Sequence, residues 1–170
     1  MSYNNGKWDN FSLPATALGK GVSEPSKITF INNIEILAFD TGNYVYGTFE
    51  LPYQYKQFSS VGFHVHWAPN TANAGNCIWS VEVTRASDNQ AYSGSTVLTV
   101  TTAAPGATWQ LTQSELPSLV GTSFLIGDQF AFKLMRNSTD NTFTGLAAFL
   151  SLGIHYVQDS LGANNEHTKT

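Results

Sequence analysis

The chain has 170 residues, which is the size of one domain, and 42% of them are hydrophobic. Only 12% are charged and the net charge is -4, so the few Lys and Arg residues form no basic patch and nucleic-acid binding is not expected. The aromatic share of 13% argues against a disordered chain. The single cysteine, Cys77, excludes an intrachain disulfide framework and a multi-cysteine zinc site.

No leader and no membrane-spanning segment is expected. Residues 1–13 contain no apolar run flanked by positive charge, which a signal peptide would have. The longest apolar stretch, residues 146–157, is interrupted by Ser151, Gly153 and His155 and is too short to cross a bilayer. We therefore expect synthesis in a cytoplasm and no contact with a membrane.

The chain is expected to divide into three parts. Residues 1–25 carry several glycines and two prolines, which favours an extended N-terminal arm over a strand. Residues 26–161 are expected to form a single β-sandwich domain. Residues 162–170 are polar and are expected to form a C-terminal tail.

Within the domain, hydrophobic and polar residues alternate with the period of two that indicates strands. The pattern is clearest at residues 61–67, where every second residue from Phe63 to Trp67 is apolar and where His64 and His66 share the other face. The remaining predicted strands are residues 27–31, 33–39, 44–51, 77–84, 95–102, 124–126, 129–135 and 146–157.

Residues 112–119 interrupt this pattern. Thr112 followed by Glu115 resembles a capping box, so one short helical turn is predicted there, limited in length by Pro117. No long helix alternates with the strands, which excludes βαβ architectures. The prediction is an all-β sandwich or barrel of about eight or nine strands.

The apolar faces of these strands predict the core. Trp67 and Trp79 fall on apolar faces and are expected inside, whereas Trp8 and Trp109 lie in less regular segments and are expected at a surface or an interface. The predicted core residues are Phe63, Val65, Trp67, Trp79, Val81, Phe130, Phe132, Leu150, Leu152 and Ile154.

The sequence contains no catalytic motif: nucleophile elbows, phosphate-binding loops and HExxH are absent. Glu35, Glu50 and Glu82 lie on predicted strands and are expected to face solvent, although such residues could meet across a sheet as a glycosidase pair. We expect neither enzymatic activity nor a cofactor.

The histidines form the one cluster with chemical content. His64 and His66 point the same way from one strand, with their imidazoles about 7 Å apart, and His155 lies near the middle of the last strand. A shared metal ion would need a third ligand, which His155 or a symmetry-related subunit could supply. The neighbouring positions on the same face carry no carboxylate, so we expect a hydrogen-bonded structural cluster on nearby strands and no metal.

Three segments, in chain order, resemble one protein family. Residues 7–17 (KWDNFSLPATA) resemble the "W-D-D-L-x-F-P-A-T" stretch of a family of virion structural proteins from tailed double-stranded DNA phages. Residues 62–67 (GFHVHW) and 77–82 (CIWSVE) resemble that family's "H-x-H-W … W-x-x-E" pair of strands. Residues 153–162 (GIHYVQDSLG) are similar to its "D-I-H-Y-x-x-D-x-x-G-S" close, with Gly153 in place of the Asp.

The resemblance implies a jelly-roll component of a phage particle with no enzymatic activity. A capsid decoration or cement protein is the first choice, which implies a homotrimer that binds the major capsid protein on the outside of the head. The protein would be made in the cytoplasm of the bacterial host and located in the virion. Trp8, Phe11 and Pro14 of the arm, together with Trp109, would then be interface candidates.

Two other classes stay open. A carbohydrate-binding jelly roll, as part of a phage host-recognition structure, would use exposed aromatic residues and loop Asn or Asp residues. A cupin-like metal enzyme would need the three histidines to converge with a carboxylate. The Glu that follows the HxH motif of cupins is missing after His66.

Overall fold

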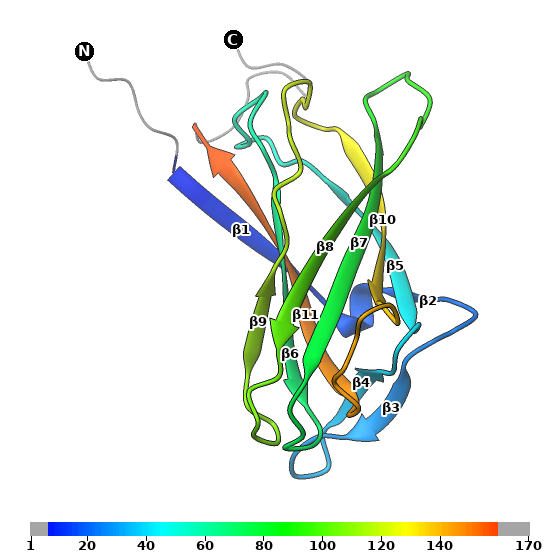
Figure 1. The fold of residues 1–170 in the computed structure, drawn as a ribbon. Coiled ribbons are helices and arrows are strands. Elements are labelled where there is room, and N and C mark those ends of the chain that lie inside the picture. Colours follow the sequence, from blue (N-terminus) through cyan, green and yellow to red (C-terminus); the bar gives the residue numbers. More distant parts are fainter. Residues whose placement is uncertain (1–6, 160–170) are drawn as a thin grey trace.

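Two antiparallel β-sheets stacked face to face form the fold, and the computed structural model describes residues 7–159 (Figure 1). The first sheet has the order β3-β4-β11-β6-β9, and β1 pairs with β11 as well. Its strands are β1 (Lys7–Pro14), β3 (Ser26–Thr29), β4 (Glu35–Phe39), β6 (Gly62–Pro69), β9 (Thr112–Glu115) and β11 (Ala147–Gln158). The second sheet has the order β2-β5-β10-β7-β8. Its strands are β2 (Gly19–Lys20), β5 (Tyr44–Glu50), β7 (Asn76–Ala86), β8 (Thr96–Ala103) and β10 (Gln129–Arg136).

The connections of β4 to β11 are those of a jelly roll. Four of these strands form the row β4-β11-β6-β9 in the first sheet, and the other four form the row β5-β10-β7-β8 in the second. The chain crosses between the sheets at every connection except the β7–β8 hairpin, which gives two interlocked Greek keys. The predicted all-β sandwich is therefore confirmed, with β1, β2 and β3 added to the jelly roll.

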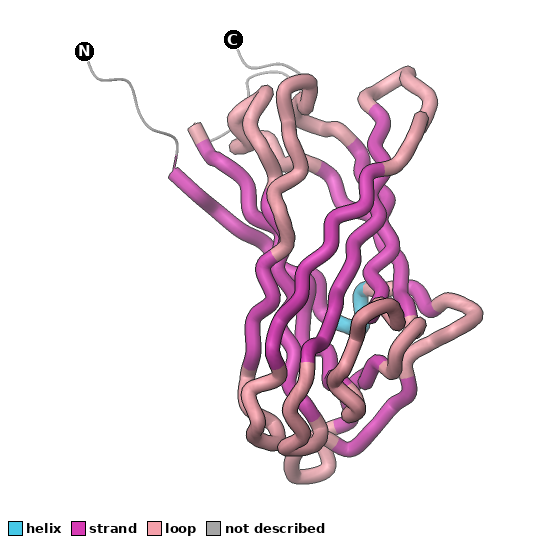
Figure 2. The backbone as a smooth tube through the Cα atoms, viewed as in Figure 1, coloured by secondary structure: helices cyan, strands magenta, loops and turns pink. Residues whose placement is uncertain are grey.

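The only helical element among residues 7–159 is the short turn η1 (Ala15–Ala17), which Figure 2 shows in cyan beside the magenta strands. In this part of the chain no helix is long and apolar enough to span a bilayer.

The core lies between the sheets and is rich in aromatic residues. Trp67 and Trp79 are fully buried, with their ring centroids 6.3 Å apart, and Phe39 contacts Trp79 edge to face. Nine of the ten predicted core residues are buried as expected: Phe63, Val65, Trp67, Trp79, Val81, Phe130, Phe132, Leu152 and Ile154.

Leu150 is the core residue that was wrongly predicted, because it is only half-buried. The pairing of β11 with β6 shifts register between Phe149 and Ser151, which is the mark of a β-bulge. A bulge changes which face successive side chains point to, so Phe149 lies in the core before it and Leu152 lies in the core after it. The alternation therefore changes phase at Leu150.

The expected N-terminal arm is extended, but residues 7–14 form a paired strand and not a free arm. β1 pairs with β11 from Lys7 opposite Gln158 to Pro14 opposite Ser151. Phe11 packs against the core, with its ring centroid 5.8 Å from that of Phe49. The sandwich therefore includes residues before the boundary expected at residue 26, whereas residues 1–6 and the tail at 162–170 lie outside the described part.

The helical turn predicted from Thr112 is also wrong. Residues 112–115 form strand β9, which pairs with β6 at the edge of the first sheet. Ser114 is buried there and accepts a hydrogen bond of 2.9 Å from Nε1 of Trp67. A tertiary contact thus overrides the local capping signal. The predicted strand at residues 124–126 is a loop. With β1, β2 and β9 included, the described residues form eleven strands, which exceeds the eight or nine predicted.

A buried arginine holds the end of the sandwich where β10 finishes. The Arg136 guanidinium is fully buried and donates to the carbonyl oxygens of Phe39 and Gly145 at 2.9 and 2.6 Å, and also to that of Phe143. These bonds replace the water that the cation loses on burial. They join the β10–β11 loop to the end of β4.

Cys77 lies beside this guanidinium in the core. Burial raises the pKa of its thiol to about 12, although the neighbouring Arg136 favours the thiolate. The thiol is therefore protonated at neutral pH and is not a nucleophile.

Replacing Trp79 with Ala tests the packing of the core. Trp79→Ala is expected to lower the free energy of unfolding by about 3–5 kcal/mol, because it leaves a large cavity between the sheets. The exposed Trp8 provides a matched control, and Trp8→Ala is expected to change the value by less than about 0.5 kcal/mol. Urea denaturation followed by circular dichroism measures both, and equal losses would contradict the assignment of Trp79 to the core.

Candidate functional site

A polar hollow of about 380 Å³ lies at the end of the second sheet where β10 begins. Its wall is built from the last residue of β5, the β7–β8 loop and the first residue of β10. The side chains that give it its chemistry are Glu50, Asp88, Asn89, Gln90, Tyr92 and Gln129.

The sheet order explains why these residues meet. β10 lies between β5 and β7, and Gln129 is the register partner of both Glu50 and Ala86. Directly paired residues of antiparallel strands point to the same face, so Glu50 and Gln129 lie side by side on the outer face of the sheet. The loop after Ala86 turns at Asn89, which has a φ of 58°, a conformation that Asn tolerates better than most residues.

The polar groups of the hollow are ordered in pairs of an amide and a carboxylate. Gln129 Nε2 donates to Glu50 Oε2 at 2.6 Å, and Asn89 Nδ2 donates to Asp88 Oδ2 at 2.9 Å. Each side chain has further donor or acceptor capacity, because a carboxylate accepts several hydrogen bonds and an amide has both a donor and an acceptor group. The hollow therefore offers planar groups that can both donate to and accept from a ligand.

Tyr92 adds an aromatic surface to the hollow. It lies on the β7–β8 loop, and 52% of its surface is exposed. An aromatic side chain presents an apolar ring and a polar hydroxyl group together, which suits a ligand that has both kinds of surface.

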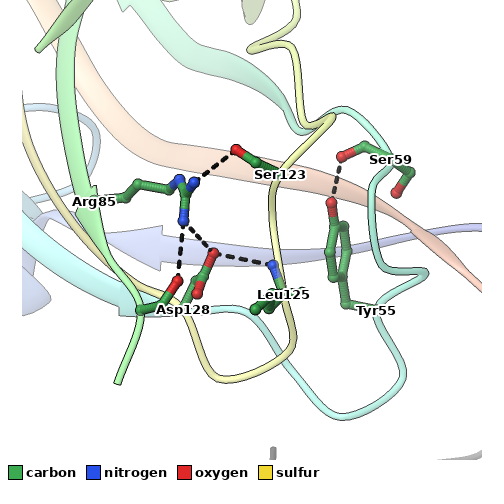
Figure 3. A network of polar contacts seen from close by, with 7 residues as sticks. Tyr55, Ser59, Arg85, Ser123, Leu125 and Asp128 are labelled. Carbon is green, nitrogen blue, oxygen red and sulfur yellow. Dashed lines mark hydrogen bonds and ion pairs between the residues drawn. The ribbon is translucent and has the colours of Figure 1, made fainter. Parts of the chain in front are cut away.

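Arg85 and the buried Asp128 form an ion pair (Figure 3), and each is the chain neighbour of a residue that lines the hollow. Arg85 Nη1 lies 2.8 Å from Oδ2 of Asp128, whose side chain is 1% exposed, and the same oxygen accepts the backbone N–H of Leu125. Arg85 also donates to Ser87 and Ser123. The pair links the end of β7 to the loop before β10. Arg85 directly precedes Ala86, and Asp128 directly precedes Gln129.

A larger hollow of about 470 Å³ lies near the bulge in β11. At this point the strand that pairs with β11 changes from β4 to β1. Its lining is mainly apolar and includes Pro14, Leu37 and Leu150. Lys27, on its rim, lies 4.0 Å from Glu35, which also lines it. It therefore offers a ligand fewer ordered polar groups than the hollow at Tyr92.

The three histidines meet on the outer face of the first sheet, as predicted. His64 and His66 come from β6 and His155 from the adjacent β11. The His64 ring centroid lies 4.4 Å from that of His155 and 4.5 Å from that of His66, closer than the separation expected from strand spacing, because the two rings tilt toward each other edge to face. His155 Nε2 and His64 Nδ1 form a short hydrogen bond.

The surroundings of the rings are hydrogen-bonding groups. His66 contacts Ser151 Oγ and Gln113 Oε1, each at 3.3 Å. β9 also places the carboxylate of Glu115 opposite His64, which sequence reasoning missed because it assigned these residues to a helical turn. Among residues 7–159, no group of three or more His, Cys, Asp or Glu side chains has a geometry that could hold a metal ion.

The four interface candidates lie in different settings. Trp8 and Pro14 are exposed on β1, with Trp8 exposed over 61% of its surface. Phe11 is half-buried and packs on Phe49 at the edge of the core. Trp109 is half-buried and contacts Phe30 edge to face, with ring centroids 4.9 Å apart.

Solved structures with a similar fold include three carbohydrate-binding modules. The CBM36-1 domain of a multidomain xylanase from the hindgut metagenome of Trinervitermes trinervoides is 14% identical, with a TM-score of 0.46 over 86% of this chain and 96% of that chain. CBM35 from Cellvibrio japonicus Abf62 is 13% identical, with a TM-score of 0.43 over 88% and 98%. The C-terminal CBM6 of LamC from Zobellia galactanivorans is 12% identical, with a TM-score of 0.44 over 86% and 98%. These values assign no function to the chain.

The sequence itself matches no protein-family model and no curated protein.

The histidine cluster predicts acid sensitivity of the fold. Burial, reinforced by His155 and His66, lowers the pKa of His64 to about 4, whereas an exposed histidine has a pKa of about 6.5. Between these values the unfolded chain binds more protons than the folded chain, so the free energy of unfolding falls as the pH is lowered from about 6.5 to about 4. The expected loss from His64 is about 2–3 kcal/mol.

Urea denaturation at pH 7, 5.5 and 4.5 measures this loss. The variant His64→Gln is expected to lose less stability over the same range, because it lacks the depressed imidazole. Equal pH dependence of the variant and the original chain would show that other groups cause the effect.

Proposed function

We propose that this chain is a non-catalytic carbohydrate-binding module and that the hollow at Tyr92 is its binding site. The observation that carries the proposal is the combination found there: two ordered amide–carboxylate pairs beside an exposed aromatic ring. The neighbouring folds named above are consistent with the proposal, and the surface chemistry of the hollow supports it independently.

The chemistry of the hollow suits a sugar. A sugar ring carries hydroxyl groups that donate and accept hydrogen bonds at its rim, and C–H groups that form apolar faces. Glu50 and Asp88 accept hydrogen bonds, while Gln129 and Asn89 can do both. The Tyr92 ring offers an apolar surface to the face of the sugar. Because the polar groups are already held in pairs, little side-chain entropy is lost when a ligand binds.

We propose that the protein binds the sugar and does not catalyse a reaction of it. The general acid of a glycosidase is typically a carboxyl group in an apolar pocket that keeps its proton at neutral pH. Glu50 and Asp88 are instead exposed and accept hydrogen bonds from the neighbouring amides. The exposed position suits an acceptor for a ligand hydroxyl better than a proton donor.

Replacing Tyr92 tests the proposed site. A neutral-glycan array is expected to identify a bound oligosaccharide, and Tyr92→Ala is expected to weaken its binding at least tenfold in isothermal titration calorimetry, because the ring surface is lost. Tyr92→Phe should retain most of the affinity. Trp8→Ala, on the opposite sheet, serves as a control and should leave binding unchanged.

Loss of binding in Trp8→Ala with full binding in Tyr92→Ala would move the site to the first sheet. An array without any bound glycan would contradict the proposed function.

A second proposal, the phage particle component, rests on the family resemblance and one structural observation. The resembling segments occupy β1, β6, β7 and β11, and the strands β1, β11 and β6 are neighbours in the first sheet. Their shared outer face carries the exposed Trp8. We propose this face as the contact with the major capsid protein, in a homotrimer on the outside of the head in the virion.

Purified heads of the phage that encodes the chain test this second proposal. The protein is expected to sediment with empty heads and to appear on their surface by electron cryo-microscopy, and Trp8→Ala is expected to weaken this binding. Light scattering should give a trimer. A strict monomer of 18.5 kDa would contradict the trimer, and absence from the heads would contradict the particle role.

A further inference from the structure

A pair of tyrosine rings lies flat on the outer face of the second sheet, on the same strand as Glu50. Tyr44 and Tyr46 both belong to β5 and are separated by one residue, so their side chains point to the same face. Tyr46 is exposed over 51% of its surface. Neither ring belongs to the hollow at Tyr92.

Glycines on both sides of Lys20 hold these rings in place. A Cβ atom at Gly19 would overlap the Tyr46 ring, and one at Gly21 would overlap the Tyr44 ring, so each ring lies directly against the backbone. Gly19 is also the register partner of Tyr46 in the pairing of β2 with β5. The Tyr44 hydroxyl accepts a hydrogen bond of 3.1 Å from the backbone N–H of Val22. One face of each ring is therefore fixed on the protein, which leaves the Tyr46 surface ordered and open.

The rings and the hollow lie on one line along β5. Tyr44, Tyr46, Thr48 and Glu50 alternate with buried or half-buried residues and share the outer face. Glu50 lies four positions after Tyr46 along the strand, which corresponds to about 13 Å. Ala131 is the register partner of Thr48, so small side chains cover the surface between the rings and the hollow.

The lysines along this path are paired within the protein. Lys133 Nζ lies 3.1 Å from Glu82 and 5.7 Å from the centre of the Tyr44 ring. Lys20 Nζ lies 3.5 Å from Glu24 at the near edge. The lysine charges are therefore compensated, whereas the hollow carries the carboxylates of Glu50 and Asp88 bonded to neutral amides. Such a surface repels an anionic ligand and favours a neutral one.

We infer that the outer face of β5 extends the site at Tyr92, so that the protein binds a linear neutral oligosaccharide that reaches from the hollow to the Tyr46 ring. This inference rests on the proposed carbohydrate binding and specifies its ligand. The hollow holds one end of the ligand through hydrogen bonds. The Tyr46 ring stacks on a sugar further along the chain, which a ligand confined to the hollow cannot reach.

A length series tests the inference. Calorimetry with the di- and hexasaccharides of the cello-, xylo- and malto-series should find a series in which the hexasaccharide binds about tenfold more tightly than the disaccharide, a gain typical of one added aromatic contact. Tyr46→Ala is expected to reduce this gain to within about twofold and to leave the affinity for the disaccharide unchanged.

Two further variants distinguish the contribution of the Tyr46 ring itself from the contribution of its position. Tyr46→Phe keeps the ring and should keep the gain with length. Gly19→Ala keeps the tyrosine but displaces its ring, so it should lose most of the gain. An unchanged melting temperature confirms that the Tyr46 variants are folded, as expected for an exposed position. For Gly19→Ala, a cooperative thermal transition serves the same purpose.

The outcomes distinguish the two levels of the proposal. Equal affinities for disaccharide and hexasaccharide, or a full gain in Tyr46→Ala, would overturn the extended site while binding at Tyr92 stands. If the chain binds no member of these three series, the neutral linear ligand inferred here is wrong. A branched neutral glycan that is bound in the array through Tyr92 would then leave only the hollow as the site.

Discussion

Strand β10 is fixed at both ends by a buried charged group, and the arrangement of the second sheet depends on this constraint. Asp128 precedes the strand and pairs with Arg85, whereas Arg136 ends it and donates to backbone carbonyls. A buried charge without partners is costly, so each end can occupy only the position where its partners are met. β10 lies between β5 and β7, and its placement therefore determines which outer-face residues of those strands meet. The pairing of Gln129 with Glu50 is one result.

The alternation of apolar residues was sufficient to predict which faces of the central strands are buried. Phe63, Trp67 and Trp79 were assigned to the core on this pattern alone, and all three are buried. The meeting of His64 with His155 was also predictable, because both lie on the polar faces of long strands. The signal for β1 was present too: Phe11 and Leu13 alternate with exposed residues, but the glycines and prolines of this region favoured an arm.

Other features depend on contacts between distant segments and left no local signal. The phase change at Leu150 follows from a bulge, which sequence alternation alone does not reveal. Thr112 to Glu115 became a strand because β6 offers a free edge and Trp67 needs an acceptor for its indole N–H. The hollow combines Glu50, Gln129 and a loop from a third segment, and only the strand order brings these together. The exposed tyrosines of β5 were visible in the sequence, whereas their support by Gly19 and Gly21 was not.

The space above Gly153 links two positions that are far apart in sequence. A Cβ atom at residue 153 would overlap the imidazole of His64, its register partner on β6. Any larger residue at 153 therefore requires the ring at 64 to rotate away or to be replaced by a smaller side chain. The "D-I-H-Y" pattern that this segment resembles combines Asp at this position with the H-x-H pair, which requires the first imidazole to be rotated away. The orientation of that ring should therefore differ between chains with glycine at this position and chains with a larger residue.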